Sequence, residues 1–206
     1  MVILFRYCIS VLLILIIAGP AHATFFNNST GLASPTQTVD FSEHTFADDT
    51  PITTQFSDVG LTFAPNLYYE NTFAPGVPNS TAPDLTNFIP SNGSGLTNPF
   101  SIFFSSPVTS AALVLGTNPN TTMFTAFLGG VMVDSGSAPS SLGNPNDFYG
   151  FTGVTFDQIT VSVGGDGFAV LDTVQTVPVP EPSQWILFVA GAGILVAFVR
   201  GRRVTA

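Results

Sequence analysis

Short apolar runs, separated by clusters of Gly, Pro, Asn and Ser, recur along most of this chain. None of them has the length or the 3.6-residue period of an amphipathic helix. In residues 159–163, apolar and hydroxyl side chains alternate, which indicates a strand with one buried and one solvated face. The runs that we expect to form strands are residues 39–41, 52–56, 61–63, 100–104, 108–115, 123–128, 131–133, 148–151, 156–163 and 168–174. Many short strands bounded by turn residues predict an all-β fold, a single β-sandwich.

Two connections between these runs have a distinctive composition. The glycine-rich residues 164–167 lie between the alternating run and a second run at 168–170, which predicts a β-hairpin. Residues 69–98 are rich in Pro, Asn, Ser and Thr, which predicts a long loop region. Loops on a rigid scaffold commonly carry binding residues, so this region is a candidate for a site.

The N-terminal segment has the pattern of a secretory signal peptide. A single positive charge at Arg6 precedes an apolar run at residues 11–18, a Gly-Pro pair and then Ala21-His-Ala23. Signal peptidases accept small side chains at the two alanine positions, so we expect cleavage after Ala23 and Thr24 as the mature N-terminus. An uncleaved membrane anchor is the alternative, but the apolar run is short for a spanning helix.

The C-terminal segment joins an extended stretch, an apolar stretch and a basic cluster. Its prolines fix φ and remove backbone donors, which predicts an extended chain. The uncharged residues 185–199 would form a helix of about 22 Å, whose flanking arginines stay in the cytoplasm by the positive-inside rule. A buried core helix is the alternative. The residues that carry these features are Pro180, Glu181, Pro182, Ser183, Trp185, Arg200, Arg202 and Arg203.

This order and spacing resemble the PEP-CTERM sorting signal of Gram-negative bacteria, a region also labelled an ice-binding-protein C-terminal domain. The resemblance implies recognition by an integral-membrane exosortase, with cleavage near residues 180–182. It also implies an association with exopolysaccharide and biofilm. Gly201 interrupts the arginines, which departs slightly from the family pattern. The predicted organisation is a signal peptide at 1–23, an exported β-sandwich domain at 24–176 and a sorting tag with a transmembrane helix at 177–206.

The body ahead of this tag resembles jelly-roll or galactose-binding-like sandwiches. The matching segments are Val39-Asp-Phe41, Gln55-Phe-Ser-Asp-Val-Gly-Leu-Thr-Phe63, Phe148-Tyr-Gly-Phe151 and Phe168-Ala-Val-Leu-Asp172. These are common strand-and-turn patterns, so the resemblance implies a fold and not a ligand.

The predicted exported domain contains twelve Asp and Glu residues and no Lys or Arg, because all four basic residues lie in the two terminal segments. Such a body cannot neutralise phosphates, which excludes nucleic acid and makes anionic surfaces poor partners. His44 is the one side chain of the body that can form a salt bridge. The charge pattern fits a soluble protein in an ion-buffered exterior, and solubility alone is a sufficient reason for it.

Catalytic motifs are missing from the body, which has no Cys and one His. It has no Gly-x-Ser-x-Gly elbow, no His-Glu-x-x-His helix and no phosphate-binding loop ahead of a Lys. A glycosidase needs two carboxylates across a cleft, and the twelve acids leave a matrix-acting hydrolase open as an alternative. We therefore expect a protein that is not an enzyme.

Two ligand classes have candidate residues. Tyr68, Tyr69 and Tyr149 are the aromatic side chains available as a carbohydrate platform, although half-buried strand ends are the simpler interpretation. Asp172, in a regular final strand, would share a face with apolar Val170 and Val174, so its carboxylate needs a partner.

No Lys or Arg of the body can pair with that carboxylate. The remaining interpretations are an exposed edge, backbone donors or a bound cation. For the cation we expect Ca²⁺, with Asp40 as a second ligand.

The sequence thus predicts an exported, surface or extracellular protein with a structural or adhesive role in an exopolysaccharide matrix. Before processing, the C-terminal helix holds it in the inner membrane with its C-terminus in the cytoplasm. A carbohydrate-binding module with a defined loop site, a matrix-acting hydrolase and an ice-binding protein are the alternatives. Its expected partners are signal peptidase, an exosortase-type membrane protease and extracellular polysaccharide.

Overall fold

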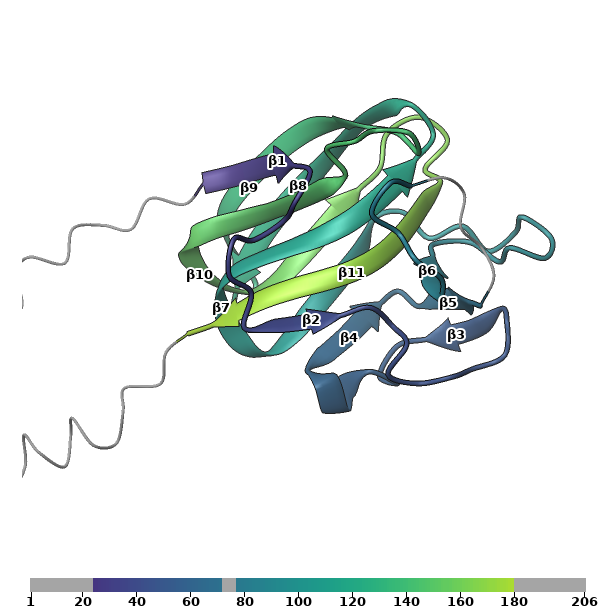
Figure 1. Cartoon of the computed structure of the whole chain (residues 1–206), viewed down its shortest axis with the longest axis horizontal. Helices are drawn as coiled ribbons and strands as arrows, with labels where there is room; N and C mark the ends of the chain where they lie inside the picture. Colours follow the sequence, from purple (N-terminus) through teal and green to yellow (C-terminus); the bar gives the residue numbers. More distant parts are fainter. Residues whose placement is uncertain (1–23, 72–76, 180–206) are drawn as a thin grey trace, which may run out of the picture.

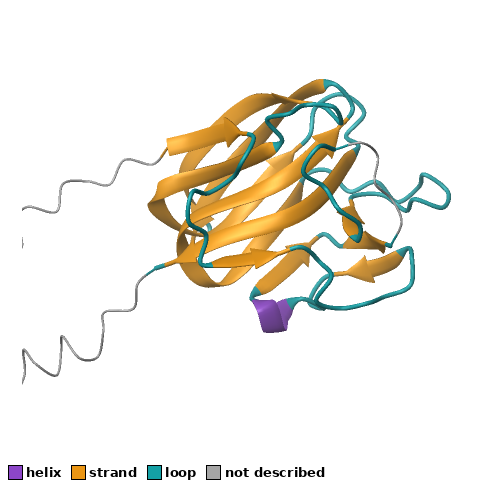
Figure 2. Ribbon diagram, viewed as in Figure 1, coloured by secondary structure: helices purple, strands orange, loops and turns teal. Residues whose placement is uncertain are grey.

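A computed structural model describes residues 24–71 and 77–179 of the chain. These residues form eleven strands and one short 3₁₀ helix, η1 (Ser57–Val59), and they contain no α-helix (Figure 2). The strands are β1 (Thr24–Asn28), β2 (Gln37–Val39), β3 (Thr50–Ile52), β4 (Leu61–Ala64), β5 (Leu67–Glu70), β6 (Asp84–Thr86), β7 (Phe100–Thr117), β8 (Asn120–Leu128), β9 (Val131–Ser140), β10 (Phe148–Ser162) and β11 (Ala169–Pro178). The all-β prediction is confirmed.

Two long strands, β7 and β10, run through both halves of a sandwich-like sheet (Figure 1). In one half, β10 pairs with β1 and with residues 108–114 of β7, and β7 pairs with β11. This half continues from β11 through β6 and β5 to β3, and β2 pairs with the end of β11. In the other half, residues 100–104 of β7 pair with β4 and β10, and β10 pairs with β8, which pairs with β9.

The division between the halves coincides with irregular pairing. Along β10 the register with β7 shifts between Thr152 and Phe156, and again between Phe156 and Gln158. These shifts let each long strand leave one half and enter the other, as bulges do at the corners of sandwiches. The sequence runs at 100–104 and 108–115 are therefore parts of one strand.

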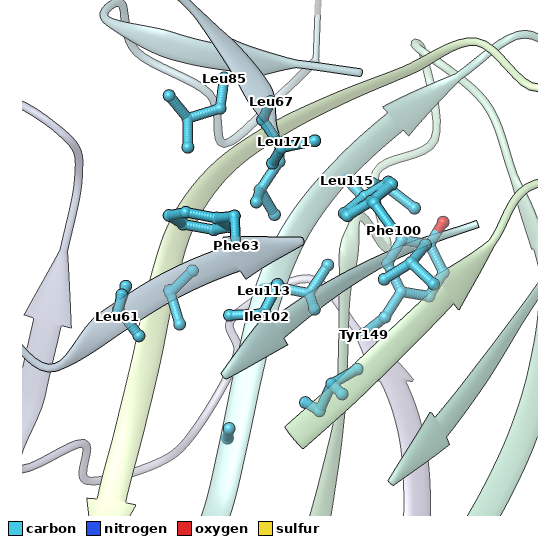
Figure 3. Packing of buried hydrophobic residues seen from close by; sticks show 14 of the residues in the cluster. Leu61, Phe63, Leu67, Leu85, Phe100, Ile102, Leu113, Leu115, Tyr149 and Leu171 are labelled. Carbon is cyan, nitrogen blue, oxygen red and sulfur yellow. The ribbon is translucent and has the colours of Figure 1, made fainter. Parts of the chain in front are cut away.

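The core lies between the two halves and is dominated by aromatic and branched side chains. Figure 3 shows buried side chains from β4, β5, β6, β7 and β11 converging there. Near β1, the Phe25 ring stacks on Phe124 at 5.5 Å, and Phe124 stacks on Tyr149 at 4.9 Å. A Cβ at Gly136 of β9 would overlap the Phe25 ring, so this glycine makes room for β1.

The predicted hairpin at residues 164–167 is wrong. The strands on either side, β10 and β11, do not pair with each other, because β7 lies between them. The glycine-rich turn instead carries the chain from the half that contains β8 to the half that contains β6. The predicted loop region at 69–98 contains the end of β5 and all of β6, so it too is more regular than its composition indicates.

The predicted terminal signals lie outside the described residues. These include Ala21 and Ala23 of the cleavage site and the whole sorting signal from Pro180 onward. Thr24, the expected mature N-terminus, is the first residue of β1, and β11 extends to Pro178, two residues past the expected domain boundary. Within residues 24–71 and 77–179, no helix is long and apolar enough to cross a membrane.

Candidate functional site

A hollow of about 430 Å³ lies at one end of the sandwich, beside the start of β8 and the end of β9. Ligand sites in proteins commonly enclose about 300–1,000 Å³, so this hollow can hold a small polar ligand. Its lining consists of Pro, Asn, Ser and Gly only, without a charged or aromatic side chain. The lining residues are Pro119, Asn120, Pro139, Ser140, Ser141, Gly143, Asn144 and Pro145.

A network of buried hydroxyls fixes the wall formed by β8 and β9. The Thr117 hydroxyl donates to Ser140 Oγ at 2.8 Å, and Ser140 Oγ donates to Asn120 Oδ1 at 3.2 Å. Thr122 Oγ1 lies 2.7 Å from Ser140 Oγ and 3.1 Å from Asn120 Oδ1. Since the hydroxyls are buried and mutually satisfied, this wall is rigid.

Asn144 also lines the hollow and is held by the end of β9 and by β10. Its Nδ2 donates to the Pro139 carbonyl at 3.2 Å and to Tyr149 Oη at 3.1 Å, and its Oδ1 accepts from the Asn146 N–H at 3.0 Å. Tyr149 Oη donates to the Pro139 carbonyl at 3.1 Å. Burial raises the pKa of Tyr149, against the lowering effect of the Asn144 hydrogen bond, so its hydroxyl stays protonated at neutral pH.

The predicted tyrosine platform is not present. Tyr69 and Tyr149 are 1% and 0% exposed, so neither ring offers a face to a sugar. Each supports the fold instead: the Tyr69 hydroxyl donates to the His44 carbonyl at 2.8 Å, and Tyr149 packs on Phe124. Tyr68 is half-buried and lies on the opposite face of β5 from Tyr69. Of the three, only Tyr149 supports the hollow, because its hydroxyl bonds to the lining residues Asn144 and Pro139 from behind.

The residues of the hollow include a short sequence motif that occurs twice in the chain. The tripeptide Asn-Pro-Asn occurs twice, at 118–120 and at 144–146, and both copies contribute to the lining. Proline and asparagine are typical of turns, so the composition of these segments predicts turns and not a binding site. Their recurrence is the feature that would have indicated a paired, amide-lined site.

A second polar cluster is a row of three carboxylates across β5, β6 and β11. Glu70 pairs with Asp84, and Leu85 pairs with Leu171, so Asp172 follows opposite Asp84 in the same register. Their neighbours in sequence point into the core, which places the three carboxylates on the outer face of the sheet. Asp84 and Asp172 are nevertheless fully buried there.

Residues 79–81 bind three buried aspartates, and we call this arrangement the aspartate clamp: Asp84, Asp147 and Asp172 with residues 79–81. The Thr81 N–H donates to Asp172 Oδ2 at 2.6 Å, and the Ser80 hydroxyl donates to Asp84 Oδ1 at 2.7 Å. The Asn79 N–H and Nδ2 donate to the two oxygens of Asp147 at 2.9 and 2.5 Å. Backbone and hydroxyl donors therefore take the place of the absent cationic side chains.

The pKa values of the two facing aspartates are raised. Burial, with a smaller contribution from the nearby Asp172 and Glu70 carboxylates, raises the pKa of Asp84 to about 7, against the lowering effect of the Ser80 hydrogen bond. Burial raises the pKa of Asp172 to about 6, although the Thr81 and Thr173 hydrogen bonds lower it. Asp84 Oδ2 is buried without a hydrogen-bond partner among the described residues, which also disfavours the charged form.

The face predicted for Asp172 is wrong in part. Pairing between β11 and β7 shifts between Asp172 and Val174, and the intervening Thr173 has a φ of 23°. This bulge returns Val174 to the core, whereas Asp172 stays on the outer face with its carboxylate bonded to backbone donors. Backbone bonding was one of the interpretations left open by the sequence.

The residues do not fit the predicted calcium site. Asp40 is exposed and accepts hydrogen bonds from Ser42, whereas Asp172 is buried and bonded to Thr81 and Thr173. The two carboxylates share no partner. Over the described part of the chain, no group of three or more His, Cys, Asp or Glu residues is arranged to hold a metal ion.

Comparison with known proteins gives structural likeness only. No protein-family model matches the sequence, and no curated protein matches it either. Among solved structures, the fold is similar to CsCBM6-3 from Clostridium stercorarium, solved in complex with cellobiose, at 13% identity and a TM-score of 0.35. It is also similar to a family 6 carbohydrate-binding module at 14% identity and a TM-score of 0.33. Each match covers 69% of this chain and 94% of the other, and neither assigns a family or a ligand to it.

Proposed function

We propose that this chain is an exported surface or matrix protein that adheres to neutral extracellular polysaccharide through the hollow between its two Asn-Pro-Asn segments. The observation that carries the proposal is the lining of that hollow, which consists of amides, hydroxyls, carbonyls and proline rings without a charge. Sugar hydroxyls can pair with the donor and acceptor positions that the internal hydrogen bonds of Asn120 and Asn144 leave open, and proline rings offer apolar contact.

The charge of the body favours a neutral glycan over an anionic one. Its acids have no Lys or Arg beside them, so a uronate or sulfate would meet repulsion over the whole domain. A neutral chain of hydroxyls avoids this cost. Many weak contacts of this kind suit a structural or adhesive role in an exopolysaccharide matrix.

The export route is proposed from the terminal segments. Signal peptidase would release Thr24, residues 185–199 would hold the body in the inner membrane, and an exosortase would cleave near Pro180–Pro182. The product would then reach the cell envelope surface or the exterior. The intact mass of protein from its own host tests this route: a mass that retains residues 185–206 in the membrane fraction means that the tag is an anchor only.

We infer a binding role in preference to a hydrolytic one. Two carboxyl groups with shifted pKa values would suit a glycosidase, but Asp84 and Asp172 are fully buried and engaged by residues 80 and 81. No substrate can approach them in this arrangement. The hydrogen bonds of Asp84 and Asp172 hold residues 80 and 81 against the sheet, which is a structural role and not a catalytic one.

Gly143 provides the decisive test of the hollow, because a Cβ built there meets nothing within 4 Å. We expect Gly143→Trp to fill the hollow and abolish saturable binding of the exported protein to its host's neutral exopolysaccharide. Gly143→Ala, the matched control, adds one methyl group to open space and leaves binding intact. Equal binding by both variants would overturn the proposed site.

A further inference from the structure

An apolar hairpin tip is the most exposed hydrophobic feature of the described structure. The turn between β8 and β9 carries Leu128, Val131 and Met132, which are 36%, 68% and 62% exposed. Two glycines with positive φ, Gly129 and Gly130, complete a tight turn that leaves these side chains without cover. Three exposed apolar side chains on one turn indicate a surface that meets another phase or partner.

The same end of the sandwich carries both exits of the chain. The Gly129 N–H donates to Asp157 Oδ2 at 2.9 Å, and the adjacent Phe156 pairs with Val108, which pairs with Pro178 at the end of β11. Two strand spacings of about 4.8 Å each therefore separate this part of β10 from the C-terminal exit. β1 begins opposite Thr152, on the same side of the molecule (Figure 1).

The number of residues after Pro178 limits the distance between this end of the sandwich and the apolar segment at residues 185–199. Six residue steps separate Val179 from Trp185, which spans at most about 20 Å even when fully extended. A sequence of 15 uncharged, apolar residues follows. Once that segment enters a bilayer, the end of the sandwich that carries the tip faces the bilayer and lies within reach of it.

We propose that the β8–β9 tip inserts into the lipid interface while the chain is anchored by residues 185–199. This inference rests on the proposed anchor and deepens it. The charged groups nearest the tip are Asp134 of β9 and Asp157 of β10, and the described chain has no Lys or Arg. The surface that fits is therefore a zwitterionic phospholipid interface, held by apolar contact and not by attraction to anionic headgroups.

Insertion of the tip would fix the orientation of the body on the membrane. The hollow lies at the opposite end of the β8–β9 hairpin, beside Asn120 and Ser140. A body held by its tip and its tag would thus present the hollow away from the lipid. Two contacts with the membrane restrict the rotation that a single point of attachment allows.

The test places a fluorescent side chain at the tip of the full-length protein. Trp185 is the only Trp of the chain, so Trp185→Phe removes the background, and Val131→Trp then reports from the tip. Both changes are made in full-length protein reconstituted into phosphatidylcholine vesicles, with or without brominated acyl chains. We expect bromination to quench the V131W emission by about half, as for a side chain roughly 5–10 Å into the interface.

The matched control is Thr121→Trp, an exposed position of β8 at the far end of the same hairpin. Its emission should not change with bromination. A second variant, Met132→Trp, replaces V131W if that protein does not fold. Anchored protein without quenching at either tip position overturns the tip inference alone. Protein that does not float with the vesicles at all overturns the anchor and the tip inference together.

Discussion

Asp84 and Asp172 face each other on the adjacent strands β6 and β11, both fully buried, in a domain that contains no Lys or Arg. Two carboxylates in this position cannot both be charged without a cost that no cation offsets. Residues 80 and 81 offset part of it through a hydroxyl and an N–H donor. The uncompensated cost of burial raises the pKa of both groups.

This pair predicts that the body is more stable in mild acid than at alkaline pH. Both pKa values are raised from 3.8, to about 7 and about 6, so the folded state binds protons that the unfolded state has released. The stability they contribute is complete below about pH 4 and is lost as the pH rises through 6 and 7. We expect a melting temperature several degrees higher at pH 5 than at pH 8, measured by circular dichroism.

A substitution separates this effect from general charge repulsion. Asp84→Asn keeps the shape of the side chain without a titrating group, so the variant should gain stability at pH 8 and lose the pH dependence near pH 7, while the part near pH 6 that comes from Asp172 remains. Glu43→Gln removes one exposed carboxylate and should leave the pH dependence unchanged. An Asp84→Asn variant with the full pH dependence would contradict the assignment.

Asp147 is predicted to be the strongest anchor of the segment at residues 79–81. It accepts from both the N–H and the side-chain amide of Asn79 and is fully buried. Asp147→Ala leaves both donors unpaired and should cost about 1–3 kcal/mol of unfolding free energy in a urea titration. Glu43→Ala, which removes an exposed carboxylate, should change it by less than about 0.5 kcal/mol. Equal effects would refute the clamp.

Gly136 on β9 is predicted to be intolerant of any side chain. Its Cβ would lie 2.1 Å from the Phe25 ring, which is packed between Phe124 and Phe151. Gly136→Ala should therefore displace β1 and cost about 1–3 kcal/mol, in the range of overpacked cores. Gly143→Ala is the matched control, since its methyl group meets nothing. Limited proteolysis near residue 28 in G136A alone would report the loosened strand.

The Tyr149 hydroxyl is predicted to affect binding more than folding. Tyr149→Phe keeps the ring in the core but removes the donor to Pro139 and the acceptor for Asn144. Asn144 then loses a fixed position in the hollow, and we expect polysaccharide affinity to fall by about 3- to 10-fold, or about 0.5–1.5 kcal/mol. Tyr69→Phe removes a comparable buried hydroxyl away from the hollow and should leave affinity unchanged. The same loss in both variants would argue for a general effect on the fold.

Much of the fold could be predicted because its rules are local. Alternation at residues 159–163 identified a strand with a buried face, and the charge inventory identified His44 as the one ion-pair donor, which bonds Asp58 at 3.0 Å. The β7 strand was divided in two because Ser105, Ser106 and Pro107 have the composition of a turn. In the structure the chain passes through these residues in extended form. The corner of a sandwich and a turn use similar residues, so composition alone does not distinguish them.

The candidate site was less predictable because its parts meet only in three dimensions. The bulge at Thr173 changes which residues of β11 face the core. An alternating sequence pattern does not predict where the pairing register shifts by one residue. A tyrosine ring has the chemistry of a sugar platform, but whether the rings of Tyr149 and Tyr69 are exposed depends on the neighbours that cover them, Phe124 and Phe46. The two Asn-Pro-Asn segments lie 26 residues apart in sequence and contribute to one hollow only when β9 returns alongside β8.

Because β7 and β10 each contribute to both halves of the sandwich, neither half is a module that evolution or an engineer could exchange alone. Cutting the chain between them would remove a central strand from each sheet at once and leave two open hydrophobic faces. The body should therefore melt in a single transition, with no half-folded species to trap. If the chain crosses a membrane before it folds, as the proposed export route requires, nothing stable forms until β11, the last described strand, has emerged beside β7.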